Sequence, residues 1–270
     1  MKKNKYLIKP DIKNLDLTRF VEGIDEKKQK ITTKVIHEKP LTIFLNSHEI
    51  VTLMSIGDHP NYLAIGYLLN QNMIRSEDKI KKIEYQKDLD TIIIRTNRRT
   101  NYEKKLRKKI TTSGCAQGTV FGDIYEEIEK IKLAYKTKIK HDWIYELSKK
   151  ITLTPSLYLE AGAIHGSVLC KNNKPLIYME DVGRHNAVDK IAGYMFLNNI
   201  QANDKIFYTT GRLTSEMVIK TVKMGIPILI SRSGFTSWGV ELAQKTNLTL
   251  IGRAKGKRYT VLSGMQRLIN

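Results

Sequence analysis

The chain has 270 residues and a mass of 31.0 kDa, enough for one large core or two small domains, and its 41% of hydrophobic residues excludes a wholly disordered chain. A net charge of +19 admits an anionic ligand, an anionic membrane surface or nucleic acid as a partner. No apolar stretch approaches the ~20 residues of a membrane helix, and two cysteines, Cys115 and Cys170, exclude a disulfide scaffold and a four-cysteine zinc site.

The first part of the chain predicts a smaller, mixed α+β domain that is rich in strands. Its first ~30 residues are polar, and we expect them to be loosely ordered. Extended segments follow at 31–36, 41–45 and 50–56, and residues 80–97 alternate as a strand pair. Between them, Asp58 is placed to cap a helix entered through Pro60. We therefore predict an N-terminal β-rich domain with one helix over residues 1–110.

A short segment at 111–118 is small, contains glycine and has no apolar period, which predicts a flexible loop. A helix should follow, because Val120, Ile124, Ile128 and Ile131 share one helical face. Cys115 lies in this loop, after Lys108 and Lys109 and before the start of the helix. Nearby cations and a helix start both favour thiolate over thiol, so Cys115 is suited to nucleophilic or sulfur-carrying chemistry. Cys170 closes an apolar stretch and is interpreted as a core residue.

The second half alternates between strands and helices. Strands are predicted at 176–179, 205–209, 226–230 and 248–251, and the first three are followed by helices at 185–197, 214–225 and 236–246. A further strand is predicted at 259–262. This rhythm predicts an α/β layer with a largely parallel sheet over residues 119–270.

The loops that follow these four strands each contain a glycine and an arginine. The arginines are Arg184, Arg212, Arg232 and Arg253. Ligands of open α/β sheets bind beyond the carboxyl ends of the strands, where glycine allows close approach and arginine offers a fork for phosphate oxygens. We therefore expect a ligand that bears phosphate. The alternative is that the arginines pair within the fold with Glu180, Asp181, Asp189 or Glu216.

Several runs in these loops resemble the formate dehydrogenase accessory sulfurtransferases, the FdhD family. The longest is Met179-Glu180-Asp181-Val182-Gly183-Arg184-His185-Asn186-Ala187-Val188-Asp189-Lys190, and others are Thr210-Gly211-Arg212, Gly225-Ile226-Pro227 and Gly57-Asp58-His59-Pro60. The resemblance covers the chain from about residue 30. It implies a larger domain similar to the cytidine deaminase fold.

The resemblance further implies a cytoplasmic homodimer that acts as a sulfur carrier. A cysteine desulfurase would load a persulfide onto Cys115. The carrier would then pass sulfur to the molybdenum bis(molybdopterin guanine dinucleotide) cofactor, which goes into the formate dehydrogenase catalytic subunit. GDP is a mimic of the guanine nucleotide part of this bound substrate.

The resemblance also implies a set of site residues. Cys115 is the catalytic residue, and no protein-ligated metal is expected because the deaminase His-x-Glu and Pro-Cys-x-x-Cys ligands are missing. Many members carry a Cys-x-x-Cys pair in the loop, whereas here Cys115 stands alone with Gln117 nearby. The residues expected to hold the cofactor are His165, Asp181, Arg184, His185, Asn186, Asp189, Lys190, Gly211, Arg212, Arg232, Ser233, Arg253, Ala254, Lys255, Gly256, Lys257 and Arg258.

Three other functions remain open at this point. The first is a non-catalytic chaperone that binds the molybdenum cofactor, with Cys115 incidental. The second is a hydrolase that uses Cys115 as nucleophile together with His165 or His185. The third is a nucleic-acid binder, because residues 79–109 are strongly basic, but RNA-recognition and zinc-finger motifs are missing. We expect neither nucleic acid nor a membrane to be the partner. No apolar core of a signal peptide follows the lysine-rich N-terminus, so a cytoplasmic protein is expected.

Overall fold

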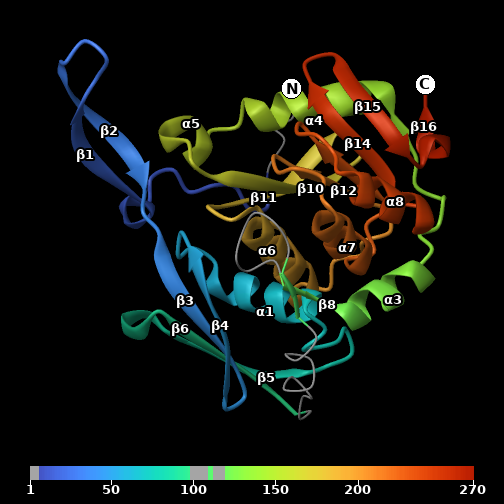
Figure 1. The fold of residues 1–270 in the computed structure, drawn as a ribbon, viewed down its shortest axis with the longest axis horizontal. Coiled ribbons are helices and arrows are strands. Elements are labelled where there is room, and N and C mark those ends of the chain that lie inside the picture. The colour runs from blue at the N-terminus through green and yellow to red at the C-terminus, as the bar shows by residue number, and fades with distance from the viewer. Residues whose placement is uncertain (1–5, 98–108, 112–118) are drawn as a thin grey trace.

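The structure, a computed structural model, describes residues 6–97, 109–111 and 119–270 (Figure 1). Two small sheets precede the predicted loop. β1 (Thr18–Ile24) and β2 (Lys30–Ile36) form an antiparallel ribbon, and a four-stranded sheet has the order β4-β3-β6-β5. Its strands are β3 (Lys39–Leu45), β4 (His48–Ser55), β5 (Ile80–Gln86) and β6 (Thr91–Thr96), and α1 spans Pro60–Asn70.

The rest of the described chain surrounds a six-stranded sheet. The elements before this sheet are β7 (Lys109–Thr111), β8 (Thr119–Phe121), α3 (Gly122–Lys130), β9 (Ile139–Lys140), α4 (His141–Thr152) and α5 (Leu157–Ala161). Those of the sheet and its cover are β10 (His165–Lys171), β11 (Lys174–Asp181), α6 (Arg184–Leu197), β12 (Ile206–Thr209), α7 (Ser215–Lys223), β13 (Ile228–Ser231), α8 (Ser237–Lys245), β14 (Thr249–Lys255) and β15 (Arg258–Ser263). A final short strand, β16 (Leu268–Ile269), pairs with β9.

Two expectations about the N-terminal part are wrong. The segment before residue 31 is not loosely ordered throughout, because Thr18–Ile24 pairs with Lys30–Ile36 along its whole length. Asp58 does not cap α1. The cap residue is His59. Its φ of 48°, together with the φ of 80° at Gly57, takes the chain through the left-handed region before α1 begins. Asp58 instead forms an ion pair with Lys190 of α6.

The large sheet is mixed, not largely parallel as the alternation predicted. Its order is β11-β10-β12-β13-β14-β15, and only the β12–β13 and β13–β14 ladders are parallel. β10 and β11 form a hairpin, and β10 also pairs antiparallel with β12. β11, β12, β13 and β14 nevertheless all run in one direction, so their carboxyl ends share one edge, as expected. The helices that follow the first three are confirmed within a residue or two.

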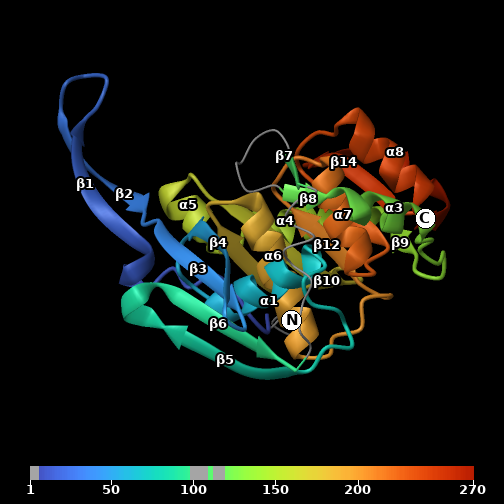
Figure 2. The same cartoon turned by 60° about the horizontal axis from the view of Figure 1, so that its bottom comes forward.

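Helices cover both faces of this sheet (Figure 2). Alternate strand residues such as Phe207 and Leu229 face the core shared with α1, α3, α6, α7 and α8. Their neighbours Tyr208 and Ile230 face a second core under α4. Ile124 and Ile128 of α3 are buried as expected, but Val120 lies in β8, before the helix begins.

Helices α1 and α6 touch through their backbones. A Cβ added at Gly66 would lie 1.7 Å from the carbonyl oxygen of Asp189, and one at Gly193 would lie 1.9 Å from that of Tyr62. The first core consequently includes α1 residues such as Leu63 together with α6 residues such as Val188. The two predicted domains share this core, and the position of the boundary between them stays a prediction. Among the described residues, no helix is long and apolar enough to cross a membrane.

Candidate functional site

The loops at the carboxyl edge of the large sheet are joined by hydrogen bonds. The Ser231 hydroxyl donates to the Gly211 carbonyl at 2.6 Å and accepts from the Ser233 amide at 2.9 Å. The Arg253 amide in turn donates to the Ser233 carbonyl at 2.8 Å. Gly252 has no room for a side chain, because an added Cβ would lie 2.4 Å from the Phe235 ring. These contacts fix the backbones of three arginine-bearing loops relative to one another.

Positively charged side chains gather at this edge around His165, the first residue of β10. Burial lowers the pKa of His165, and the charges of Arg184 and Arg232 lower it further, followed by His185 and Arg212. The imidazole is therefore neutral at pH 7, and its Nδ1 lies 3.3 Å from the Thr210 hydroxyl. We call His165, Arg184, Arg212 and Arg232 the basic cluster. It brings together predicted residues from four separate segments of the chain.

A glycine makes room for one arginine of the basic cluster, and an aromatic ring holds another in place. A Cβ at Gly211 would lie 3.0 Å from Cβ of Arg184, so the glycine leaves room for this side chain. The Arg232 guanidinium lies 4.5 Å above the centre of the Tyr158 ring, a cation–π contact. An arginine held in this way loses little conformational entropy when it binds an anion.

Three of the four carboxylates that might have paired with the arginines have other partners. Glu180 accepts from the backbone amides of Leu157 and Tyr158, at 2.8 and 3.2 Å. Burial raises the pKa of Glu180 to about 7, although these two hydrogen bonds act against the shift. Asp181 pairs with Lys190 at 2.5 Å, and Asp189 pairs with Lys220 at 2.7 Å. Each of these three carboxylates thus engages groups other than an arginine.

Three of the predicted ligand-binding residues are buried and form contacts within the protein. Asp181 and Lys190 are both 0% exposed, and Lys190 also donates to the Glu180 carbonyl at 2.9 Å. Asn186 donates to Asp181 at 3.0 Å and to the Met54 carbonyl at 2.8 Å. These residues tie the cluster-bearing loop to the β4–α1 turn. Asp181 and Lys190 support the site from below the surface, whereas Asn186 also lines a neighbouring cavity.

A cavity of about 300 Å³ adjoins the basic cluster at His185. His185 Nε2 lies 3.1 Å from the Glu216 carboxylate, although neither of its buried ring nitrogens makes a hydrogen bond of good geometry. Burial lowers the pKa of His185, although Glu216 acts against the shift. The carboxylate favours a proton on Nε2, which leaves Nδ1 as an acceptor. Other lining residues are Glu38, Leu53, Met54, Tyr67, Val182, Gly183, Asn186, Asp189 and Lys220.

The predicted basic segment at 252–257 is not a simple loop after the fourth strand. β14 continues to Lys255, and only Gly256 and Lys257 turn the chain into β15. An open hollow of about 780 Å³ lies against this hairpin, lined by Arg253, Lys255, Gly256, Lys257 and Arg258 together with Tyr145, Tyr259 and Thr260. Ala254 is buried in the second core instead, and its carbonyl accepts from the Ser148 hydroxyl at 3.0 Å. The hollow thus combines cations with aromatic rings.

The predicted nucleophile, Cys115, lies outside the described residues. The strands on either side of its segment pair with each other, with Thr111 opposite Thr119. The other cysteine, Cys170, is fully buried in β10 as expected, and burial raises its thiol pKa far above the usual value. Among the residues that the structure describes, there is no cluster of three or more His, Cys, Asp or Glu side chains placed to hold a metal ion.

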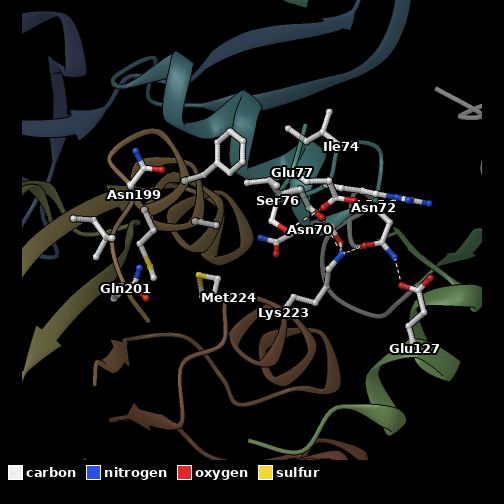
Figure 3. Close-up of a pocket in the computed structure, with 16 residues that line it drawn as sticks. Asn70, Asn72, Ile74, Ser76, Glu77, Glu127, Asn199, Gln201, Lys223 and Met224 are labelled. Atoms are coloured by element: carbon white, nitrogen blue, oxygen red, sulfur yellow. Dashed lines mark hydrogen bonds and ion pairs between the residues drawn. The ribbon is translucent and has the colours of Figure 1, made fainter. Parts of the chain in front are cut away.

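A third hollow, of about 600 Å³, lies at the C-terminal ends of α1, α6 and α7 (Figure 3). Lys223 there donates to the carbonyls of Leu69 and Asn70 at 2.8 and 2.9 Å, and Asn72 donates to Glu127 at 2.6 Å. None of the predicted site residues lines this hollow. It therefore stands apart from the basic cluster.

Several contributors to the site escaped prediction. Thr210 contacts His165 and accepts from the Gly166 amide at 3.0 Å, and its position before Gly211-Arg212 was the only available signal. Tyr158 carries no such signal, because its role depends on contacts made across the fold, whereas Lys220 stands among the residues that resemble the FdhD family. Lys220 matters here because it neutralises Asp189 beside the His185 cavity.

Comparison with known proteins agrees with the resemblance seen in the sequence. The FdhD/NarQ family model matches residues 36–269. The sulfur carrier protein FdhD of Bacillus pumilus is 31% identical over 239 residues, which cover 88% of this chain and 91% of that protein. The protein of the same name from Bacillus subtilis is 29% identical over 255 residues, 94% and 96% of the two chains. The crystal structure of a putative formate dehydrogenase accessory protein from Desulfotalea psychrophila matches with a TM-score of 0.76 at 27% identity, over 93% of this chain and 98% of that one.

Proposed function

Because this chain belongs to the FdhD/NarQ family, we propose that it is a sulfur carrier protein required for formate dehydrogenase activity. Cys115 would carry the sulfur, and the basic cluster would bind the acceptor. The observation that carries the proposal is the gathering of His165, Arg184, Arg212 and Arg232 at one sheet edge, in a chain whose relatives are named sulfur carrier proteins.

The loading step exchanges one sulfur–sulfur bond for another. The Cys115 thiolate attacks the terminal sulfur of a persulfide on a cysteine desulfurase, and the desulfurase cysteine leaves as a thiolate. One bond forms as one breaks, so no external electrons are needed. The neighbouring Lys108 and Lys109 favour the thiolate that this attack requires.

The acceptor is the molybdenum bis(molybdopterin guanine dinucleotide) cofactor, bound as a substrate. Arg184, Arg212 and Arg232 would hold phosphate oxygens through charge-assisted hydrogen bonds, and the neutral His165 would bond to a neutral polar group. The N-termini of α6, α7 and α8 point to the same edge and add partial positive charge. The hollow beside Arg253 and Tyr145 would accommodate a further part of this large molecule.

Release of the carried sulfur as sulfide consumes two electrons. A thiol supplies them when its thiolate attacks Cys115 Sγ, forms a disulfide there and expels the terminal sulfur. Cys170 cannot be this thiol, because it is fully buried in β10 and its raised pKa keeps it protonated. The thiol must therefore come from another molecule.

The activity is accordingly that of a sulfurtransferase with a covalent persulfide intermediate. The cysteine desulfurase and the formate dehydrogenase catalytic subunit are the proposed partners. A homodimer, a cytoplasmic location and a larger domain similar to the cytidine deaminase fold remain predictions from the family resemblance.

The test is the intact mass of the protein after incubation with a cysteine desulfurase and cysteine, before and after a reductant. We expect one added sulfur that reductant removes, that Cys115→Ser abolishes and that Cys170→Ser retains. GDP binding should survive in both variants. If no sulfur is added while GDP still binds and Cys115→Ser still activates formate dehydrogenase, the protein is a non-catalytic cofactor chaperone instead.

A further inference from the structure

A threonine and a histidine from two neighbouring strands meet in the basic cluster. Thr210 directly follows β12, and its backbone amide donates to the Gly166 carbonyl at 2.9 Å. The Gly166 amide donates in return to the Thr210 hydroxyl at 3.0 Å. These two hydrogen bonds fasten Thr210 to the residue that follows His165, and they leave the Thr210 hydroxyl 3.3 Å from His165 Nδ1.

The hydrogen-bonding capacity of the Thr210 hydroxyl sets its relation to His165. A backbone amide can only donate, so the hydroxyl oxygen accepts from Gly166 and keeps its own hydrogen for another acceptor. Among the described residues, the only acceptor within reach of that hydrogen is His165 Nδ1. If Nδ1 carried a proton and donated to the hydroxyl, the hydroxyl hydrogen would have no acceptor in this part of the protein. The arrangement in which every group is satisfied has the hydroxyl donating to an unprotonated Nδ1.

The surroundings of His165 keep its ring neutral, because burial and the neighbouring arginines lower its pKa. Within the described part of the chain, no carboxylate forms an ion pair with this histidine. Its partner across the β10–β11 ladder is Asp181, and that carboxylate pairs with Lys190. A neutral imidazole has one N–H and one lone pair. With Nδ1 accepting from Thr210, the proton lies on Nε2, to which no described residue forms a hydrogen bond.

We infer that Thr210 is a positioning residue: its hydroxyl keeps the His165 proton on Nε2, from which His165 donates a hydrogen bond to an uncharged oxygen of the bound nucleotide. The arginines of the basic cluster are also donors only. The cluster therefore binds a ligand through its oxygen atoms, and an N–H group of a ligand placed at Nε2 would find no acceptor. This inference rests on the proposed function, in which the basic cluster binds the cofactor.

Nuclear magnetic resonance of protein with isotopically labelled histidine locates the proton directly. Proton–nitrogen correlation spectra at pH 7 distinguish the Nε2–H tautomer, the Nδ1–H tautomer and the imidazolium, and His165→Ala identifies the signals of His165 among the six histidines. We expect the Nε2–H tautomer in the wild type and in Thr210→Ser, which keeps the hydroxyl. Thr210→Val has nearly the same shape without the hydroxyl, so both tautomers should be populated in that variant.

Thr209→Val is the matched control. The Thr209 hydroxyl lies at the same strand end, accepts from the Gly211 amide at 3.1 Å and lies 3.4 Å from the Gly166 carbonyl oxygen. Among the described residues it bonds to backbone groups only, so its removal disturbs the same backbone without touching His165. The Nε2–H tautomer should persist in Thr209→Val. A mixture of tautomers there, equal to that of Thr210→Val, would show a general disturbance of the strand end and overturn the inference.

Calorimetry with GDP tests whether the position of the proton matters for binding. A hydrogen bond between uncharged groups changes an affinity about 2- to 10-fold. We expect Thr210→Val to weaken GDP binding about 5-fold and Thr210→Ser to stay within about twofold of the wild type. In the His165→Ala background, Thr210→Val should cause no further loss, because Thr210 acts through His165.

An Nδ1–H tautomer in the wild type would overturn the inference, and so would an unaltered tautomer in Thr210→Val. Equal GDP affinities of Thr210→Val and the wild type would overturn it as well, because His165 would then not donate to the nucleotide. A further loss of affinity in the His165→Ala background would show that Thr210 itself contacts the nucleotide. Failure of the wild-type protein to load sulfur would refute the proposed function alone, because neither the tautomer nor GDP binding depends on loading.

Discussion

Because α1 and α6 are in close contact, replacing a glycine between them by alanine should destabilise the protein, whereas this replacement usually stabilises a helix. Replacing a glycine inside a helix by alanine ordinarily stabilises the helix by about 1 kcal/mol. Gly66 lies inside α1, but an alanine there would put Cβ 1.7 Å from the Asp189 carbonyl oxygen and 2.5 Å from its carbon. Both atoms belong to the backbone of α6, so no side-chain rotation relieves the clash.

The size of the effect follows from the movement required. Ordinary contact begins at 3.4 Å, so the helices must separate by between one and two ångströms. Overpacking of this kind costs about 1–3 kcal/mol, and a clash with rigid backbone belongs at the upper end. After the gain in helix propensity is subtracted, Gly66→Ala should lose about 2 kcal/mol. For a chain of 270 residues that corresponds to a melting temperature about 4 °C lower.

Urea unfolding followed by circular dichroism measures this difference. Gly193→Ala should lose a similar amount of stability, because its Cβ would lie 1.9 Å from the Tyr62 carbonyl oxygen. Gly23→Ala in β1 is the control, because no atom lies within 4 Å of an added Cβ there. If Gly66→Ala were more stable than the wild type by about 1 kcal/mol, as helix propensity alone predicts, the backbone contact would be refuted.

Three further predictions concern charged residues of the site. Lys190→Met should lower the free energy of unfolding, measured by urea titration, by about 3 kcal/mol, because the buried Asp181 carboxylate loses its charged partner. A loss below about 1 kcal/mol would argue against the ion pair. The pKa of Glu180 is about 7 in the folded protein and 4.5 ordinarily, so between these pH values the folded state binds more protons than the unfolded state. The free energy of unfolding should therefore fall as pH rises from 5 to 7 and level off above pH 7. Glu180→Gln should weaken that dependence in unfolding curves measured at each pH, and an unaltered dependence would exclude Glu180 as its source. Arg212→Ala should weaken GDP binding about 10-fold in calorimetry, and by a smaller factor at high salt. The control Arg75→Ala, beside the hollow of Figure 3, should leave the affinity unchanged. If Arg212→Ala bound GDP as tightly as the wild type, Arg212 would not belong to the site.

The parts of the fold that repeat a simple period could be predicted. The strands that end at Asp181, Thr209 and Ser231 are short apolar runs, and the helices after them carry apolar residues at helical spacing. Their shared direction predicts Arg184, Arg212 and Arg232 at one edge. β10 could not be placed, because its position between β11 and β12 depends on pairings that leave no periodic trace.

The individual contacts of the site were harder to predict than its location. The family resemblance assigns Lys190 to the cofactor, yet the side chain is fully buried and pairs with Asp58, far away in the sequence. Nothing in the sequence distinguishes Tyr158 from other aromatic residues, yet its ring makes a cation–π contact with the Arg232 guanidinium. The extended segment predicted at 31–36 is confirmed as β2, but β1 was not predicted. Most residues of β1 are exposed on both faces, so no alternation of polar and apolar residues marks it.

The ribbon of β1 and β2 has a consequence for the protein in solution. Figure 1 shows the ribbon extending away from the large sheet. Phe20, Val21, Ile24 and Ile31 are exposed, and among the described residues no third strand pairs with it. Such an edge invites association with another chain, and the charged Arg19, Glu22, Lys30 and Lys34 on the same strands oppose it. The net charge of +19 adds repulsion between copies, but salt at about 0.15 M limits its range to about 8 Å. Colloidal stability should therefore decline as salt is added, and dilute buffers will keep the protein dispersed for the binding measurements.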